Sequence, residues 1–220
     1  MVIIQTNLKC NRQCNYPHRS NKSIMVIIQT SLKCAFFAVV SAVLLFACSS
    51  ANEFTTLLDQ VEKLNISRDN YTLGKALTDK QKKIARQNTV QEASPGTLKF
   101  KDKNLYVVAE QNTDRVIILY EQYEKASEKK TQEVIGSLFL DFGDPTVMAH
   151  DKVIYWAFDA KGKVSEEKFR KIKDTKEQLQ ILATVKLSSS EKIMENPKSK
   201  NVYYIISSEP VLKWIKAKGI

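Results

Sequence analysis

The segment Leu179-Gln-Ile-Leu-Ala-Thr-Val-Lys-Leu-Ser188 is the strongest indicator of the fold. Every second residue from Leu179 to Leu187 is apolar, and most of the residues between them are polar. Successive side chains of a strand point to opposite faces of a sheet, so this period of two predicts a strand with one buried and one mostly solvated face. Such half-solvated strands are typical of antiparallel sheets.

Other segments have the apolar, β-branched and aromatic composition of strands, and turn-forming residues bound them. Ser94-Pro95-Gly96 precedes the first of these segments, and Asp159-Ala-Lys-Gly162 closes a later one. Together with 179–187 they predict about five strands. The segments are Leu98 to Phe100 with Leu105 to Ala109, then Val116 to Tyr123, Val153 to Phe158 and Val202 to Ile206.

Helices are predicted by apolar stripes at helical spacing and by residues typical of helix ends. Thr78-Asp-Lys-Gln81 fits a capping box, Ser127 fits an N-cap, and Gly143 followed by Pro145 fits a C-terminus. The predicted helices are Phe54 to Leu64, Thr78 to Asn88, Ser127 to Gly143, Ser165 to Lys176 and one from Pro210 onward. The fold class is therefore predicted as α+β, with a mainly antiparallel sheet of about five strands and helices packed on one side, in a single domain of residues 48–220.

Residues 25–50 have the pattern of a bacterial export signal, in which a polar start and an apolar run from Ala35 to Ala47 precede Cys48. The run has 13 residues, whereas a membrane-spanning helix needs about 20. Leu45-Phe-Ala-Cys48 resembles the lipobox of bacterial lipoprotein precursors. That resemblance implies a signal peptide of residues 25–47, cleavage before Cys48, acyl chains such as palmitate on that cysteine, and a membrane held through this anchor.

Three alternatives to lipidation stay open. Cleavage near Ala47 or Ala51 would release a soluble exported protein. The apolar run would otherwise stay as an uncleaved anchor, or form a buried helix in a cytosolic protein.

The first ten residues recur almost unchanged at 25–34, with Ser31 in place of Asn7. A duplicated start is the simplest explanation. Because export signals begin at their own methionine, Met25 is predicted to be the initiator. Residues 1–24 are then a mis-annotated or duplicated N-terminal extension.

Cysteine and charge content limit the chemistry of the predicted mature domain. All the cysteines, which are Cys10, Cys14, Cys34 and Cys48, lie at or before the predicted cleavage point. A disulfide framework and a thiolate metal site are thereby excluded from the exported domain. Five of the 34 basic residues and none of the 24 acidic ones precede Cys48, so residues 48–220 carry a net charge of +5. This mixed-sign charge is not typical of a nucleic-acid-binding protein.

A candidate binding surface is predicted around Tyr155, Trp156 and His150, because aromatic side chains combine large apolar faces with polar tips. Core packing of the aromatic residues is the alternative. His150 is the only histidine after the signal, so no multi-histidine metal centre is expected, and no catalytic or cofactor motif stands out. An acid–base pair of His150 with Asp144 or Asp151 is the enzymatic alternative, and a surface histidine the simpler one.

An apolar helix that runs into Gly143-Asp-Pro-Thr146, followed by an aromatic strand around Trp156, resembles the SmpA/OmlA-type small envelope lipoproteins. Members of that family support the assembly of outer-membrane barrels. The resemblance covers about 30 residues and implies an envelope scaffold, without binding residues that can be carried over.

The sequence thus predicts a lipid-anchored envelope protein that acts as a non-enzymatic binding or scaffold module for an envelope protein partner, without a cofactor. An exported small-ligand-binding or hydrolytic domain with an aromatic-lined pocket is the alternative. Ser49 and Ser50 after the cysteine resemble an outer-membrane sorting pattern. In a bacterium with two membranes, they favour the periplasmic face of the outer membrane.

Overall fold

The computed structural model describes residues 52–91, 93–149, 151–175, 179–193 and 200–218. All of them belong to one compact unit, Cys48–Ile220. The predicted signal peptide, Cys48 and His150 lie outside the described residues. Within the described part of the chain, no helix is long and apolar enough to cross a membrane.

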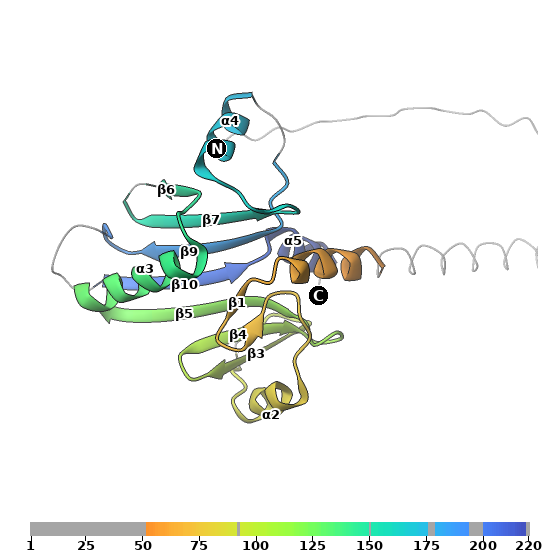
Figure 1. The fold of residues 1–220 in the computed structure, drawn as a ribbon. Coiled ribbons are helices and arrows are strands. Elements are labelled where there is room, and N and C mark those ends of the chain that lie inside the picture. Colours follow the sequence, from red (N-terminus) through yellow and green to blue (C-terminus); the bar gives the residue numbers. More distant parts are fainter. Residues whose placement is uncertain (1–51, 92, 150, 176–178, 194–199, 219–220) are drawn as a thin grey trace, which may run out of the picture. The chain divides into compact units, whose positions relative to one another are not determined.

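An eight-stranded antiparallel sheet forms the centre of this unit (Figure 1). Its order is β3-β4-β5-β10-β9-β7-β6, and β8 pairs with β7. The strands are β3 (Thr97–Asp102), β4 (Leu105–Glu110), β5 (Val116–Ala126), β6 (Val147–Ala149), β7 (Val153–Asp159), β8 (Gly162–Lys163), β9 (Ala183–Ser189) and β10 (Lys200–Ser207).

Helices and a small hairpin surround this sheet. The hairpin consists of β1 (Ser67–Arg68) and β2 (Tyr71–Thr72), which pair with each other. A first helix covers residues 52–63. The other helices are α2 (Asp79–Gln87), α3 (Glu128–Phe142), α4 (Glu166–Thr175) and α5 (Glu209–Lys218).

The α+β class and the antiparallel sheet are confirmed, but about five strands is too few. Two of the additional strands, β6 and β8, have only three and two residues, which is too short for a readable period. The alternating segment also starts later than predicted. The backbone amide of Leu182 bonds to the Phe158 carbonyl at 2.8 Å, and strand β9 begins at the next residue, Ala183.

Predicted helix ends agree with the structure where local hydrogen bonds define them. The Thr78 amide donates to the Gln81 side chain at 2.8 Å, and the Gln81 amide donates to the Thr78 hydroxyl, which completes the capping box before α2. Ser127 caps α3 by accepting from the Lys130 amide at 3.2 Å. Gly143 ends α3 with a φ of 66°, a conformation that favours glycine.

One face of the sheet, which we call the buried face, carries the core. Register places Val185 of β9 beside Ile206 of β10 and Trp156 of β7, and all three side chains are fully buried. Helix α3 contributes Val134, Ile135 and Leu138 to the same apolar core (Figure 1).

The opposite face, which we call the open face, is only partly covered. Along β10, buried residues alternate with partly exposed ones, so the side chains of Tyr203 and Ile205 retain solvent contact. Helix α5 lies against part of this face, because its Leu212 and Ile215 line a pocket together with Ile118 and Tyr120. The prediction that the helices pack on one side is therefore wrong, because α3 packs on the buried face and α5 packs on the open face.

Candidate functional site

Trp156 and Tyr155 are adjacent on β7 but point to opposite faces of the sheet. Trp156 is fully buried, its indole nitrogen donates to the Gly143 carbonyl at 2.8 Å, and its ring meets Phe139 edge-on at 5.8 Å. This side chain connects the end of α3 to the sheet. The structure therefore separates two of the residues that the sequence grouped into one binding surface.

Tyr155 lies on the open face and is half-buried. Burial raises the pKa of its hydroxyl, against the effect of a hydrogen bond with Thr184. The phenol lines a pocket of about 610 Å³ that also includes Ile181, just before β9, and Glu209 at the start of α5. His150, the third predicted residue, lies outside the described residues.

A polar cluster lies between the β1–β2 hairpin, strand β5 and α3. The Nε atom of Arg68 is 2.6 Å from Glu121, whose carboxylate also accepts a hydrogen bond from the Tyr123 hydroxyl. The other end of the guanidinium donates to the Ser137 hydroxyl at 3.1 Å. Burial acts to lower the pKa of Arg68, but the hydrogen bond and charge of Glu121, together with Tyr204 and Tyr123, raise it overall. Because Arg68 is ion-paired with Glu121 and also lies 3.5 Å from the Asp141 carboxylate of α3, the cluster is suited to holding the hairpin in place rather than to catalysis.

Tyr204 adjoins this cluster on β10. Its ring lies 5.1 Å from the Arg68 guanidinium carbon, in cation–π geometry. Its hydroxyl oxygen is buried and has no hydrogen-bond partner among the described residues. Burial raises the pKa of Tyr204 and, together with Glu121, that of Tyr123. Both phenols therefore stay neutral over the physiological pH range.

The open face carries a second cluster, which we call the Tyr–Lys surface: Lys99, Lys101, Tyr106 and Tyr120. Tyr106 on β4 is paired directly with Tyr120 on β5, and their rings stack at 4.6 Å with an interplanar angle of 5°. The Lys99 ammonium lies 5.7 and 5.8 Å from the two ring centres, and the Lys101 ammonium lies 4.9 Å from that of Tyr106. Neither lysine has an ion-pair partner within the described segments.

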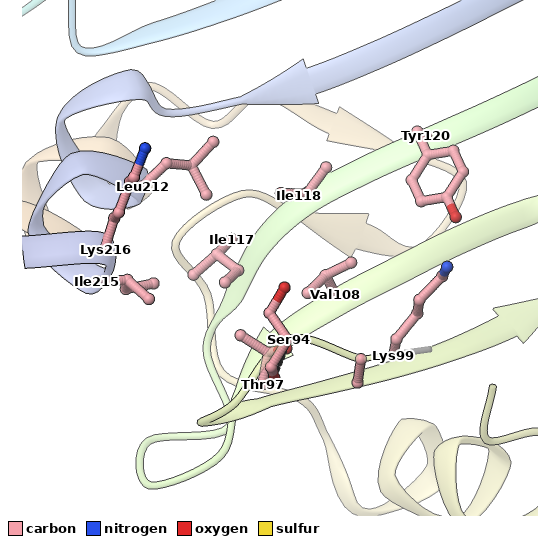
Figure 2. Close-up of a pocket in the computed structure, with 11 residues that line it drawn as sticks. Ser94, Thr97, Lys99, Val108, Ile117, Ile118, Tyr120, Leu212, Ile215 and Lys216 are labelled. Atoms are coloured by element: carbon pink, nitrogen blue, oxygen red, sulfur yellow. Dashed lines mark hydrogen bonds between the residues drawn. The ribbon is translucent and has the colours of Figure 1, made fainter. Parts of the chain in front are cut away.

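A pocket of about 430 Å³, which we call the α5 groove, adjoins the Tyr–Lys surface. Apolar side chains from three elements line it, with Val108 from β4, Ile117 and Ile118 from β5, and Leu212 and Ile215 from α5 (Figure 2). Polar groups stand around these side chains. They are Ser94, Thr97, Lys99, Tyr120 and Lys216.

The sequence analysis did not select the Tyr–Lys surface or the α5 groove. Alternation of Lys99 and Lys101 with Leu98 and Phe100 was a readable signal for two basic residues on the solvated face of a strand. The stacking of Tyr106 on Tyr120 was not readable, because it depends on the register between two strands. The groove depends in addition on where the C-terminal helix lies.

Comparison with known proteins gives no match: no protein-family model, curated protein or solved structure is significantly similar to this chain. Among the described residues, histidine, cysteine, aspartate and glutamate form no group of three or more that could hold a metal ion. The candidate sites therefore have to be interpreted from their own geometry.

Proposed function

We propose that this chain is a lipid-anchored protein of the bacterial cell envelope that acts as a non-enzymatic binding module for another envelope protein. The resemblance of Leu45 to Cys48 to a lipobox supports the anchor. The Tyr–Lys surface supports the binding role and is the observation that carries it.

Stacked tyrosines on a sheet are well suited to binding a protein. Each ring offers a large apolar face with little conformational entropy to lose, and aromatic side chains are enriched in the residues that dominate binding energies. The backbone pairing of Tyr106 with Tyr120 holds both rings in one orientation before a partner arrives. Preorganisation of this kind lowers the entropic cost of association.

The charge of the surface indicates the chemistry of the partner. The ammonium groups of Lys99 and Lys101 lie over the tyrosine rings without carboxylate partners in the described structure. An acidic surface would supply the missing counter-charges, and charge complementarity accelerates encounter and selects the partner. The proposed partner is therefore a protein with an acidic patch beside apolar residues.

The test uses the full chain in its native host. A photo-crosslinking amino acid, benzoylphenylalanine, replaces Lys101 in one strain and Lys129 in a control strain. Both lysines are exposed, but Lys129 lies on α3. An adduct found only from position 101 is identified by mass spectrometry, and the purified partner is then titrated against the full chain in nanodiscs.

Lys101→Glu and Tyr106→Ala are expected to weaken binding of that protein by about tenfold each, whereas Lys129→Glu leaves it unchanged. Changing an acidic residue of the partner to lysine is expected to restore binding to Lys101→Glu. Equal adducts from both positions, or binding unaffected by Lys101→Glu and Tyr106→Ala, would overturn the proposal.

A further inference from the structure

We infer that the α5 groove binds a long-chain carboxylate, such as a fatty acid. The alkyl chain lies on the apolar floor, and the carboxylate is held at the end formed by Lys99 and Tyr120. This inference goes beyond the protein-binding role and does not rest on it.

The floor of the groove is suited to an alkyl chain. Ile117 and Val108 belong to adjacent strands, and Ile215 faces them from α5 (Figure 2). Their exposed fractions of 2%, 9% and 6% show that these side chains are packed into the core, so the floor is apolar and fixed in place. The volume of about 430 Å³ lies within the range of small-molecule sites, which combine mostly apolar walls with a few polar groups.

One end of the groove is suited to a carboxylate. In Figure 2 the ammonium of Lys99 and the hydroxyl of Tyr120 point toward one another at the edge of the apolar floor. The Lys99 ammonium lies 5.8 Å from the Tyr120 ring centre, and within the described chain it has no ion-pair partner. One cation and one neutral donor match the single charge and two oxygens of a carboxylate. A neutral amphiphile would leave the ammonium without a counter-charge.

The walls of the groove are held in place without a ligand. Ser94 to Thr97 form a turn in which the Thr97 amide and hydroxyl both donate to the Ser94 carbonyl, at 3.1 and 2.6 Å. Gly96 has a φ of 69° in this turn, which a side chain would disfavour. On the other side, the Trp214 ring of α5 stacks on Phe54 at 4.1 Å. Both walls are therefore built before a ligand binds.

The experiment uses the full chain in membranes of its native host. The probe is hexadecanoate that carries a photoactivatable diazirine and a terminal alkyne, and mass spectrometry maps the labelled residues. Labelling is expected at the residues that line the groove, which lie within 93–99, at Val108, within 117–120 and within 212–216. Unlabelled hexadecanoate is expected to compete, whereas hexadecyltrimethylammonium, with the same chain and the opposite charge, is not.

Two variants and two controls make the test specific. Lys99→Gln removes the charge and is expected to lower labelling roughly tenfold, while Leu212→Trp fills the groove and abolishes it. Lys129→Gln and Leu140→Trp make the same changes at exposed positions on α3, where Leu140 is 88% exposed. Both controls are expected to label like the unmodified chain.

Thermal unfolding of each variant checks that the fold is retained. If Leu212→Trp does not fold, Lys99→Gln still tests the inference, because it changes only a partly exposed side chain. Labelling spread along the chain, or equal labelling of Lys99→Gln and its control, would overturn the inference. Lys101 and Tyr106, which the protein-partner experiment changes, do not line the groove. The outcome of that experiment is therefore independent of the labelling result.

Discussion

Arg68 of the small β1–β2 hairpin lies 2.6 Å from Glu121 in the middle of strand β5, although 53 residues separate them in the chain. The side chain of Glu121 is only 5% exposed, so the pair is largely removed from water. Removing one member of such a pair leaves an uncompensated buried charge.

Arg68→Met is therefore expected to lower the free energy of unfolding by about 3 kcal/mol. Urea denaturation of the full chain measures this change. The control is Arg170→Met, because the pair of Arg170 with Glu166 is exposed and should contribute less than about 1 kcal/mol. Adding Glu121→Leu to Arg68→Met is expected to recover much of the loss, since no buried charge then remains. A double variant as unstable as the single one would contradict this account.

Tyr204→Phe is expected to leave stability unchanged or to raise the free energy of unfolding by up to about 1 kcal/mol, because the buried hydroxyl has no hydrogen-bond partner among the described residues. Tyr123→Phe is the matched change in the same cluster. It removes a donor to Glu121 and is expected to be destabilising. The two variants are compared by their urea midpoints, and a larger loss for Tyr204→Phe would refute the assignment.

Stability is expected to fall at alkaline pH. Burial raises the pKa of Tyr71, Tyr123 and Tyr204, and a hydrogen bond to Asp102 adds to the shift for Tyr71. Below about pH 10 these phenols are neutral in both states, but above it the unfolded chain loses their protons first. Unfolding is therefore favoured as the pH rises.

The measurement compares urea midpoints at about pH 9 and about pH 11, on either side of the unfolded tyrosine pKa. Tyr204→Phe removes one of the shifted groups, so its midpoint is expected to drop less than that of the unmodified chain. Equal drops in both proteins would count against the contribution of Tyr204.

Two glycines of the α3 region are expected to respond oppositely to alanine. Gly143 has a φ of 66°, and a Cβ there would lie 3.1 Å from the Lys163 ammonium, so Gly143→Ala is expected to cost about 1–2 kcal/mol. Gly136 lies within α3, and a Cβ there would meet nothing within 4 Å. Gly136→Ala is expected to stabilise by up to about 1 kcal/mol, because alanine favours a helix. Thermal unfolding of the pair checks both signs.

Intact mass and fractionation of the full reading frame, expressed in its native host, test the proposed anchor. The expected product begins at Cys48, carries acyl chains and is found in membranes. Cys48→Ala is expected to abolish both the acylation and this processing. An unprocessed chain in the cytosol would refute the export signal and make residues 1–24 part of the protein.

Features that depend on neighbouring residues were predictable from the sequence. The Thr78 capping box, the Ser127 cap and the Gly143 end of α3 are local, because each uses hydrogen bonds across three or four residues. The alternation in 179–188 also indicated correctly that Val185 and Leu187 are buried. The alternation did not locate the start of β9. Leu182 lies before the strand and is also buried, so burial does not mark the first residue of the strand.

The candidate site was not predictable in the same way. Composition drew attention to Trp156 and Tyr155, but their adjacency on a strand places them on opposite faces, and only tertiary packing decides which face α3 covers. Tyr106 and Tyr120 are ordinary strand residues in the sequence and become a stacked pair through the β4–β5 register.

The sequence by itself determined the α+β class, the antiparallel sheet and several helix ends, because hydrophobic period and end-capping act over a few residues. Tertiary structure decided the strand order, the Arg68–Glu121 pair and the positions of the Tyr–Lys surface and the α5 groove. These features join residues that are distant in the chain. Strand register and the placement of α5 bring such residues together, and neither leaves a local pattern in the sequence.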